Sequence, residues 1–145
     1  MTSSLRVDFY VLPSADPGSR LHFACRLTEK AYTLNNRTYA HVGDAARARE
    51  LDELLWTFRD GSFVPHDVIE PGTSETASPV TIGTRPPERQ KPDLVINLTD
   101  TLLDGTDTFA RIAEIVTSDE GSKSRSRQHF ATYRDAGHSL ETHKI

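Results

Sequence analysis

Cysteine is nearly absent from this sequence, because Cys25 is the single one among 145 residues. One thiol cannot form a disulfide within the chain, and it excludes a zinc site built from several thiolates. Long apolar runs are also missing, and no segment has the roughly 20 consecutive apolar residues that a membrane-spanning helix needs. The first residues contain no apolar core followed by small residues, as a secretory signal would. Together these absences predict a cytoplasmic protein.

An excess of positive charge is missing as well. The formal net charge is −4 and the sequence pI is about 5.8. Proteins that grip a nucleic-acid backbone usually carry a strong positive patch and are often basic overall, so this balance favours a small anionic target over a long polyanion. A hydrophobic content of 36% over this length predicts one domain, residues 1–145, with a single core.

Glycine-rich phosphate loops are the third absence. The first apolar run, residues 7–12, is followed by PSADPG, which contains neither G-x-G-x-x-G nor G-x-x-x-x-G-K-[ST]. The histidines show no H-E-x-x-H pairing and no serine lies in G-x-S-x-G. Asp100, Asp104 and Asp107 could serve a divalent cation, but turn and helix-capping chemistry is the favoured interpretation. We therefore expect no catalytic residue, no metal and no cofactor, and Cys25 is expected in the core.

The pattern of apolar residues alternates between strand and helix. Residues 7–12 are expected to form a strand, residues 19–34 a helix and residues 38–42 a second strand. Asp44 is the expected N-cap of a second helix. Strands joined by helices of this length are parallel neighbours in an α/β sheet. Further strands are expected at residues 79–83 and at 94–98 in the sheet centre. Residues 111–116 are expected to form the last strand, with a helix as the alternative there.

A basic and aromatic stretch, residues 118–140, follows. Thr117 and Glu120 match a capping box with Thr117 as N-cap, and the helix is expected to stop at Gly137. Four residues follow the i, i+4, i+7, i+11 spacing of one helix face: Lys123, Arg127, Phe130 and Arg134. Spacing alone favours a solvated basic face. The competing hypothesis is a site for a ligand both anionic and apolar, such as an acidic peptide with a hydrophobic end or a stacked nucleotide.

A second aromatic segment is found at residues 56–66. Trp56, Phe58 and Phe63 bracket a turn at Asp60-Gly61. Two interpretations are equally supported by the residues alone: an aromatic plug under the core, or an exposed protein-docking patch, since Trp and Phe anchor interfaces.

Several segments, in their order and spacing, resemble the chi subunit of the bacterial DNA polymerase III holoenzyme over almost the full length. They are DFYVL at 8–12, LDELLW at 51–56, SFVPH at 62–66, PVTI at 79–82, DLVINL at 93–98 and YRDAGHSL at 133–140. The resemblance implies a non-enzymatic clamp-loader accessory protein. It also implies an α/β, Rossmann-like sheet flanked by helices, without a nucleotide-binding glycine loop.

In that family chi binds the acidic C-terminal tail of single-stranded DNA-binding protein, which ends in Pro-Phe. The resemblance implies that Arg127 pairs with the terminal carboxylate in a fork geometry. Val116 and Phe130 are then expected to hold the terminal ring, while Lys123 and Arg134 attract the acidic residues before it. The full set expected to bind the tail is Val116, Lys123, Arg127, Phe130, Gly137 and Arg134.

A second surface is implied at Trp56, Phe63, Val64 and Pro65. In the family this surface binds the psi subunit of the clamp loader, or an iron–sulfur helicase in some bacteria, so that DNA is reached only indirectly. The resemblance at Trp56 and Phe63 favours the interpretation as a docking patch over that as a core plug. Phe58 has no such match and is expected to be a core or supporting residue. The alternative function is direct binding of single-stranded nucleic acid by the basic-aromatic helix, with affinity that rises with oligonucleotide length and falls steeply with salt.

Overall fold

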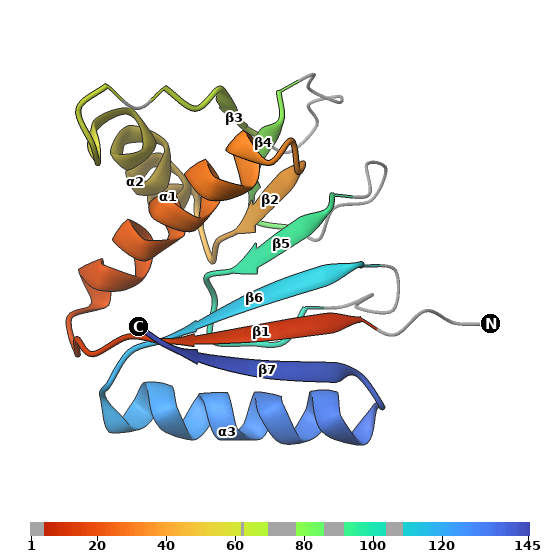
Figure 1. Ribbon diagram of the computed structural model, residues 1–145. Coiled ribbons are helices and arrows are strands. Elements are labelled where there is room, and N and C mark those ends of the chain that lie inside the picture. The colour runs from red at the N-terminus through yellow and green to blue at the C-terminus, as the bar shows by residue number, and fades with distance from the viewer. Residues whose placement is uncertain (1–4, 62, 70–77, 86–91, 104–108) are drawn as a thin grey trace.

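The computed structural model describes residues 5–61, 63–69, 78–85, 92–103 and 109–145 (Figure 1). Strands and helices alternate along most of the chain. In order they are β1 (Arg6–Val11), α1 (Pro17–Thr33), β2 (Thr38–His41), α2 (Ala45–Thr57), β3 (His66–Val68), β4 (Val80–Gly83), β5 (Leu94–Asn97), β6 (Arg111–Val116), α3 (Glu120–Asp135) and β7 (Ser139–Lys144).

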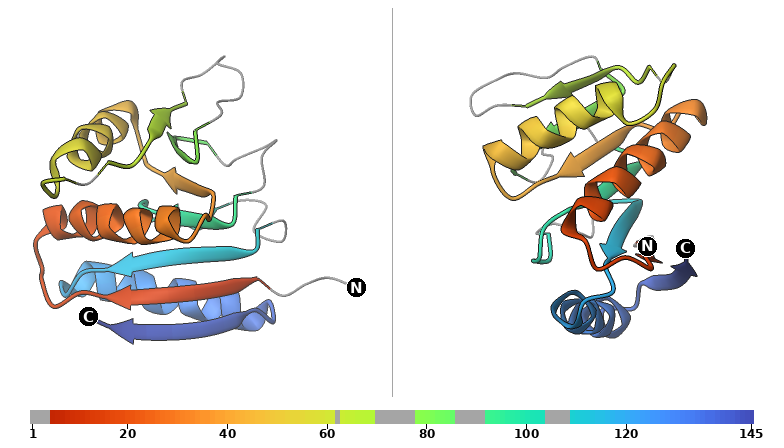
Figure 2. Two further views of the ribbon diagram at one scale, coloured as in Figure 1. Left: turned by 45° about the horizontal axis from the view of Figure 1, so that its top comes forward. Right: turned by 90° about the vertical axis from the view of Figure 1, so that its left-hand side faces the viewer.

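The described strands form one seven-stranded sheet in the order β3-β4-β2-β5-β6-β1-β7. Every paired neighbour in it is parallel. Helices α1 and α2 cover one face, and α3 lies on the opposite face, where it connects β6 to β7 across β1 (Figure 2). The expected α/β sheet flanked by helices is confirmed. Among the described residues, no helix combines the length and the apolar composition required to cross a bilayer.

The core consists of two apolar layers, one on each face of the sheet. Leu51, Cys25 and Ile96 belong to the layer under α1 and α2. Phe9 and Tyr133 belong to the layer under α3. Burial raises the pKa of the Cys25 thiol to about 12, so this cysteine is a neutral core residue, as expected. Strand β5, buried at all four positions, is the central strand of the sheet, which confirms the prediction made from its apolar run.

One predicted helix N-cap agrees with the structure and one differs. The Asp44 side chain accepts a hydrogen bond from the Arg47 N–H at 2.8 Å, as expected for an N-cap. In α3, however, the N-cap is Asp119, which accepts from the Ser122 N–H at 3.0 Å. The prediction of Thr117 as N-cap was wrong. Its hydroxyl instead donates to Asp119, whose carboxylate is the better partner for the positive end of the helix.

Two strands were not expected. The three residues of β3 are too few to show a period. The prediction that residues 111–116 form the last strand was wrong, because β7 follows and pairs with β1. Most of the side chains of β7 are polar and exposed, so its sequence lacks the apolar alternation by which strands are recognised.

Candidate functional site

Helix α3 is fixed to the sheet by one stripe of its surface. The Phe9 ring on β1 lies 5.5 Å from the Phe130 ring and 6.2 Å from the Tyr133 ring, centroid to centroid. His129 Nδ1 lies 2.6 Å from a carboxylate oxygen of Glu114 on β6. The hydrogen bond with Glu114 raises the pKa of His129, so the imidazolium is favoured in the folded protein. These contacts set the rotation of α3 about its axis.

The side of α3 turned away from His129 carries the residues that were singled out in the sequence. At about 100° per residue, Lys123, Arg127, Phe130 and Arg134 share this side, which we call the α3 flank. Within the described residues Lys123 and Arg127 form no ion pair. Arg134 contacts only its neighbour Asp135, at 3.4 Å, and both are exposed. The α3 flank therefore carries positive charge that the described part of the chain does not neutralise.

The apolar members of the expected tail site belong to the apolar layer beneath α3. Val116, 5% exposed at the end of β6, belongs to the apolar layer beneath α3. Phe130 is half-buried against the same layer. Gly137 lies beyond the helix end with φ +86°, and its N–H donates to the Arg134 carbonyl at 2.9 Å. Val116 and Phe130 thus belong to one apolar layer, but Val116 also lines the small cleft on the other side of α3. Gly137 has a backbone role in ending α3.

A small cleft lies on the other side of α3, toward the end of β5. Arg20, Asp100, Arg125 and His129 are among its lining residues. One Asp100 carboxylate oxygen forms ion pairs with both arginines, each at 3.3 Å. This carboxylate is therefore a salt-bridge partner of both arginines. Asp104 and Asp107 lie outside the described residues.

The Trp56 and Phe63 side chains form the second candidate surface, which we call the Trp56–Phe63 patch. Trp56 is 46% exposed and Phe63 is 71% exposed, and their ring centroids are 5.5 Å apart. This exposure favours the docking patch over the core plug. Phe58, in contrast, is half-buried and packs against the apolar layer under α1 and α2, as expected for a supporting residue.

The two residues after Phe63 differ from each other. Pro65 is half-buried, whereas Val64 is only 1% exposed. Val64, expected at the interface, therefore lies in the interior and cannot itself contact a partner of the folded protein. Its carbonyl is 2.7 Å from His66 Nδ1, and His66 Nε2 is 3.0 Å from a carboxylate oxygen of Asp52 on α2. These bonds hold the segment against α2 and so orient the patch.

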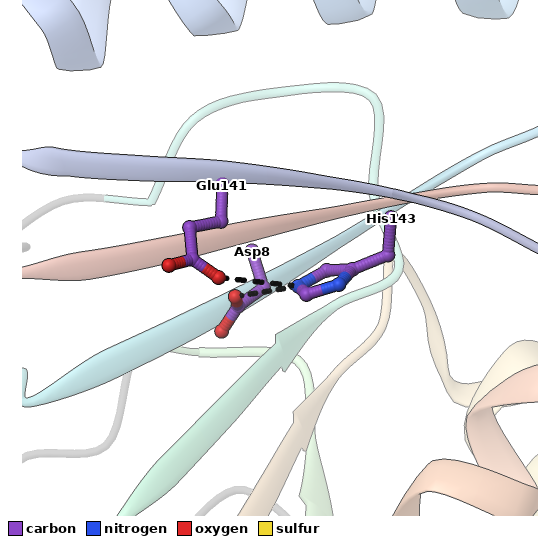
Figure 3. A group of neighbouring side chains, drawn as sticks. All are labelled: Asp8, Glu141 and His143. Carbon is purple, nitrogen blue, oxygen red and sulfur yellow. Dashed lines mark hydrogen bonds and ion pairs between the residues drawn. The ribbon is translucent and has the colours of Figure 1, made fainter.

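Sequence reasoning missed a cluster of charged residues on β1 and β7, on the face of the sheet opposite α3 (Figure 3). Asp8 is fully buried. His143 Nε2 lies 2.9 Å from one oxygen of the Asp8 carboxylate, and Arg111 Nε donates to the other oxygen at 2.6 Å. Arg6 donates to Glu141 at 3.1 Å. Burial raises the pKa of Asp8, but the hydrogen bonds with His143 and Arg111 outweigh it and hold this pKa below its usual value. The i, i+2 spacing of Glu141 and His143, which puts two side chains on the same face of a strand, was the sequence signal that could have indicated this cluster.

A metal ion is a poor fit to this cluster. The carboxylates of Asp8 and Glu141 and a ring nitrogen of His143 offer ligand atoms within 4.8 Å of one another. Two guanidinium groups, from Arg6 and Arg111, already neutralise those carboxylates and would repel a divalent cation. The cluster is an ion-pair network that joins β7 to β1.

Comparisons with known proteins bear on the whole chain. Residues 5–141 match the family model described as DNA polymerase III chi subunit, HolC. The chain is 41% identical to the DNA polymerase III subunit chi of Pseudomonas aeruginosa over 140 residues, covering 97% of this chain and 96% of that protein. It is 28% identical to subunit chi of Haemophilus influenzae, covering 94% and 95%.

Solved structures show the fold alone. T4 UvsW aligns with a TM-score of 0.69 at 8% identity, over 98% of this chain and 41% of that one. The C-terminal domain of the DEAD-box protein Dbp5 aligns with a TM-score of 0.65 at 13% identity, over 94% and 90%. The family model and the sequence relatives span nearly the full length, and on that ground the chain belongs to the DNA polymerase III chi subunit family.

Proposed function

We propose that this accessory subunit of DNA polymerase III captures the acidic C-terminal tail of single-stranded DNA-binding protein on the α3 flank. The observation that carries the proposal is the pair of cations without ion-pair partners among the described residues, Lys123 and Arg127, beside the half-buried ring of Phe130. An acidic peptide with an aromatic end has the complementary charge and shape. Arg127 takes the terminal carboxylate, and the half-buried Phe130 lines the place of the terminal ring, with Val116 in the apolar layer beneath it.

The Trp56–Phe63 patch is the proposed site for a second partner, the psi subunit or an iron–sulfur helicase, at the cytoplasmic replisome. Exposed, adjacent Trp and Phe rings are the residue types that anchor protein interfaces. Val64 supports this patch from within the core. The chain then acts as an adaptor, and it reaches DNA only through its partners.

Direct binding of single-stranded nucleic acid is the competing function. A base-stacking platform needs an aromatic ring whose face is open to solvent. The Phe130 ring is half-buried and packs against Phe9, which leaves less of it for a base. This contact favours capture of a peptide end over stacking.

The test is a fluorescence-anisotropy titration with a labelled acidic peptide ending in Pro-Phe. A second peptide lacking the final Phe and a labelled oligonucleotide of matched charge serve as controls. Saturable binding of the first peptide, lost without the Phe, is the expected result. Binding that is equal for both peptides, or stronger for the oligonucleotide and steeply dependent on salt, contradicts the proposal.

A further inference from the structure

Strand β7 is an edge strand with one unpaired side in the described part of the chain. The N–H groups of Ser139 and Ile145 donate to the carbonyls of Leu5 and Val11, each at 3.0 Å, so both point toward β1. Main-chain directions alternate with a period of two residues along a strand. The N–H and C=O groups directed away from β1 therefore belong to Leu140, Thr142 and Lys144.

The charged cluster holds this edge in place from one face. His143 contacts Asp8, and Glu141 contacts Arg6, so two side chains of β7 are tied to β1 on the face opposite α3 (Figure 3). The alternation of side chains places Leu140, Thr142 and Lys144 on the α3 face instead. Strand β7 is thus fixed by contacts that leave its outer edge and its α3 side open among the described residues.

The α3 flank lies above that edge. Helix α3 contacts both β6 and β7, and its His129 side is turned toward β6. The opposite side, with Lys123 and Arg127, is therefore turned toward β7 and beyond it. A strand added to a sheet lies about 4.8 Å from its neighbour, here on the side to which this flank is turned.

The positive charges near the outer edge of β7 indicate which kind of chain could bind there. Lys144 is in register with Val11, which is in register with Val116, so it lies level with the start of α3. Lys144 joins Lys123 and Arg127 as a cation without an ion pair among the described residues. An extended acidic peptide complements this group. A second copy of the chain would bring the same cations together across the edge.

We propose that the acidic tail binds as an added β-strand along the free edge of β7, with main-chain hydrogen bonds to Leu140, Thr142 and Lys144. The α3 flank then recognises the acidic side chains and the terminal carboxylate from above. This inference rests on the proposed tail capture and adds its mode: β-augmentation, in which the main chain supplies affinity and side chains supply specificity.

The test compares Thr142→Pro with Thr142→Val. The Thr142 N–H faces away from β1, and proline is tolerated in edge strands at such positions, so the fold is expected to survive. Proline removes the outward donor, whereas valine keeps it. We expect Thr142→Pro to weaken binding of the Pro-Phe peptide about tenfold and Thr142→Val to change it less than about twofold. Circular dichroism and thermal unfolding check that both variants are folded.

A peptide series gives a second, independent measurement. Single N-methylation at successive peptide positions removes one main-chain donor at a time, and an added strand predicts that affinity loss alternates along the peptide. Wild-type affinity in folded Thr142→Pro, with no alternation in the N-methyl series, overturns the strand mode and leaves tail capture standing. Absence of peptide binding by the wild-type chain overturns both. A wild-type dimer that Thr142→Pro dissociates assigns the edge to a second copy and also overturns the proposal.

Discussion

Asp8 on β1 links this strand to β6 through Arg111 and to β7 through His143. Its buried carboxylate is shared by His143 on one oxygen and by Arg111 on the other. Removing this charge leaves Arg111 and His143, which are 33% and 35% exposed, without their shared anion. The cluster therefore stabilises the fold, and it also positions the edge strand β7.

We predict that Asp8→Asn lowers the free energy of unfolding by about 2–4 kcal/mol near neutral pH, because Arg111 and His143 lose their shared anion. The pKa of Asp8 is lowered in the folded state, so its contribution is present above the unfolded value of 3.8 and is lost as pH falls through the folded pKa. Urea unfolding at several pH values measures this directly. The difference between wild type and variant is expected to shrink below about pH 4.

Glu141→Gln is the matched control, because this carboxylate is exposed and its pairing with Arg6 is a surface salt bridge. A loss below about 1 kcal/mol is expected there. Equal effects of Asp8→Asn and Glu141→Gln, or a difference that does not change with pH, would show that the buried carboxylate is not the centre of the cluster.

The two ends of helix α3, which carries the candidate tail site, are determined by local sequence. Asp119 begins it, and Gly137 follows its last turn in the left-handed region at φ +86°. A glycine there lets the chain reverse and enter β7 after only a short turn. The position of the α3 flank over the edge strand depends on this end.

We predict that Gly137→Ala lowers the free energy of unfolding by about 1 kcal/mol, because a Cβ is strained at positive φ. Nothing lies within 4 Å of the added atom, so packing does not contribute. Gly43→Ala is the control: its Cβ would also meet nothing within 4 Å, and its φ is not in the left-handed region. Thermal unfolding of the two variants compares them. Similar losses in both would contradict the assignment of strain to Gly137.

Periodic elements could be predicted from the sequence, and irregular ones could not. The apolar run of β5 could be recognised by its composition, and the capping aspartate of α2 by its position. The end of α2 at Thr57 could not be predicted, because Trp56 belongs both to the last turn of the helix and to an aromatic segment. Strand β7 was missed because an edge strand can be polar on both faces.

The candidate site divides in the same way. Helical spacing alone placed Lys123, Arg127, Phe130 and Arg134 on one side of α3, and the structure agrees. Val64 was misplaced because it is adjacent to Phe63, and in extended chain neighbours point in opposite directions. The charged cluster joins residues that are 135 positions apart, and only strand pairing reveals such contacts.

On the scale of the whole molecule, the two candidate surfaces lie at opposite ends of the sheet. The Trp56–Phe63 patch adjoins β3, and the α3 flank adjoins β7, the two terminal strands in the sheet order. The proposed sites for the two partners are therefore far apart in the sheet order. This separation is the geometry that an adaptor requires.

We predict that Trp56→Ala and Phe63→Ala abolish binding of the second partner while affinity for the tail peptide stays within about twofold, because the rings anchor one interface only. Pull-down with purified psi, followed by the peptide titration, measures both. Leu34→Ala is the control, since Leu34 is an exposed apolar residue, 62% accessible, outside the patch. Unfolding of both aromatic variants would instead identify the rings as part of the core.

The most direct test of tail capture is the peptide affinity of Arg127→Ala beside that of Arg49→Ala. Both arginines are exposed on helices, and neither makes an ion pair with a described residue. Arg127→Ala is expected to lose at least about tenfold in affinity while remaining folded, because the terminal carboxylate loses its partner. Arg49→Ala is expected to bind as wild type. A folded Arg127→Ala protein that keeps wild-type affinity for the Pro-Phe peptide would contradict the account.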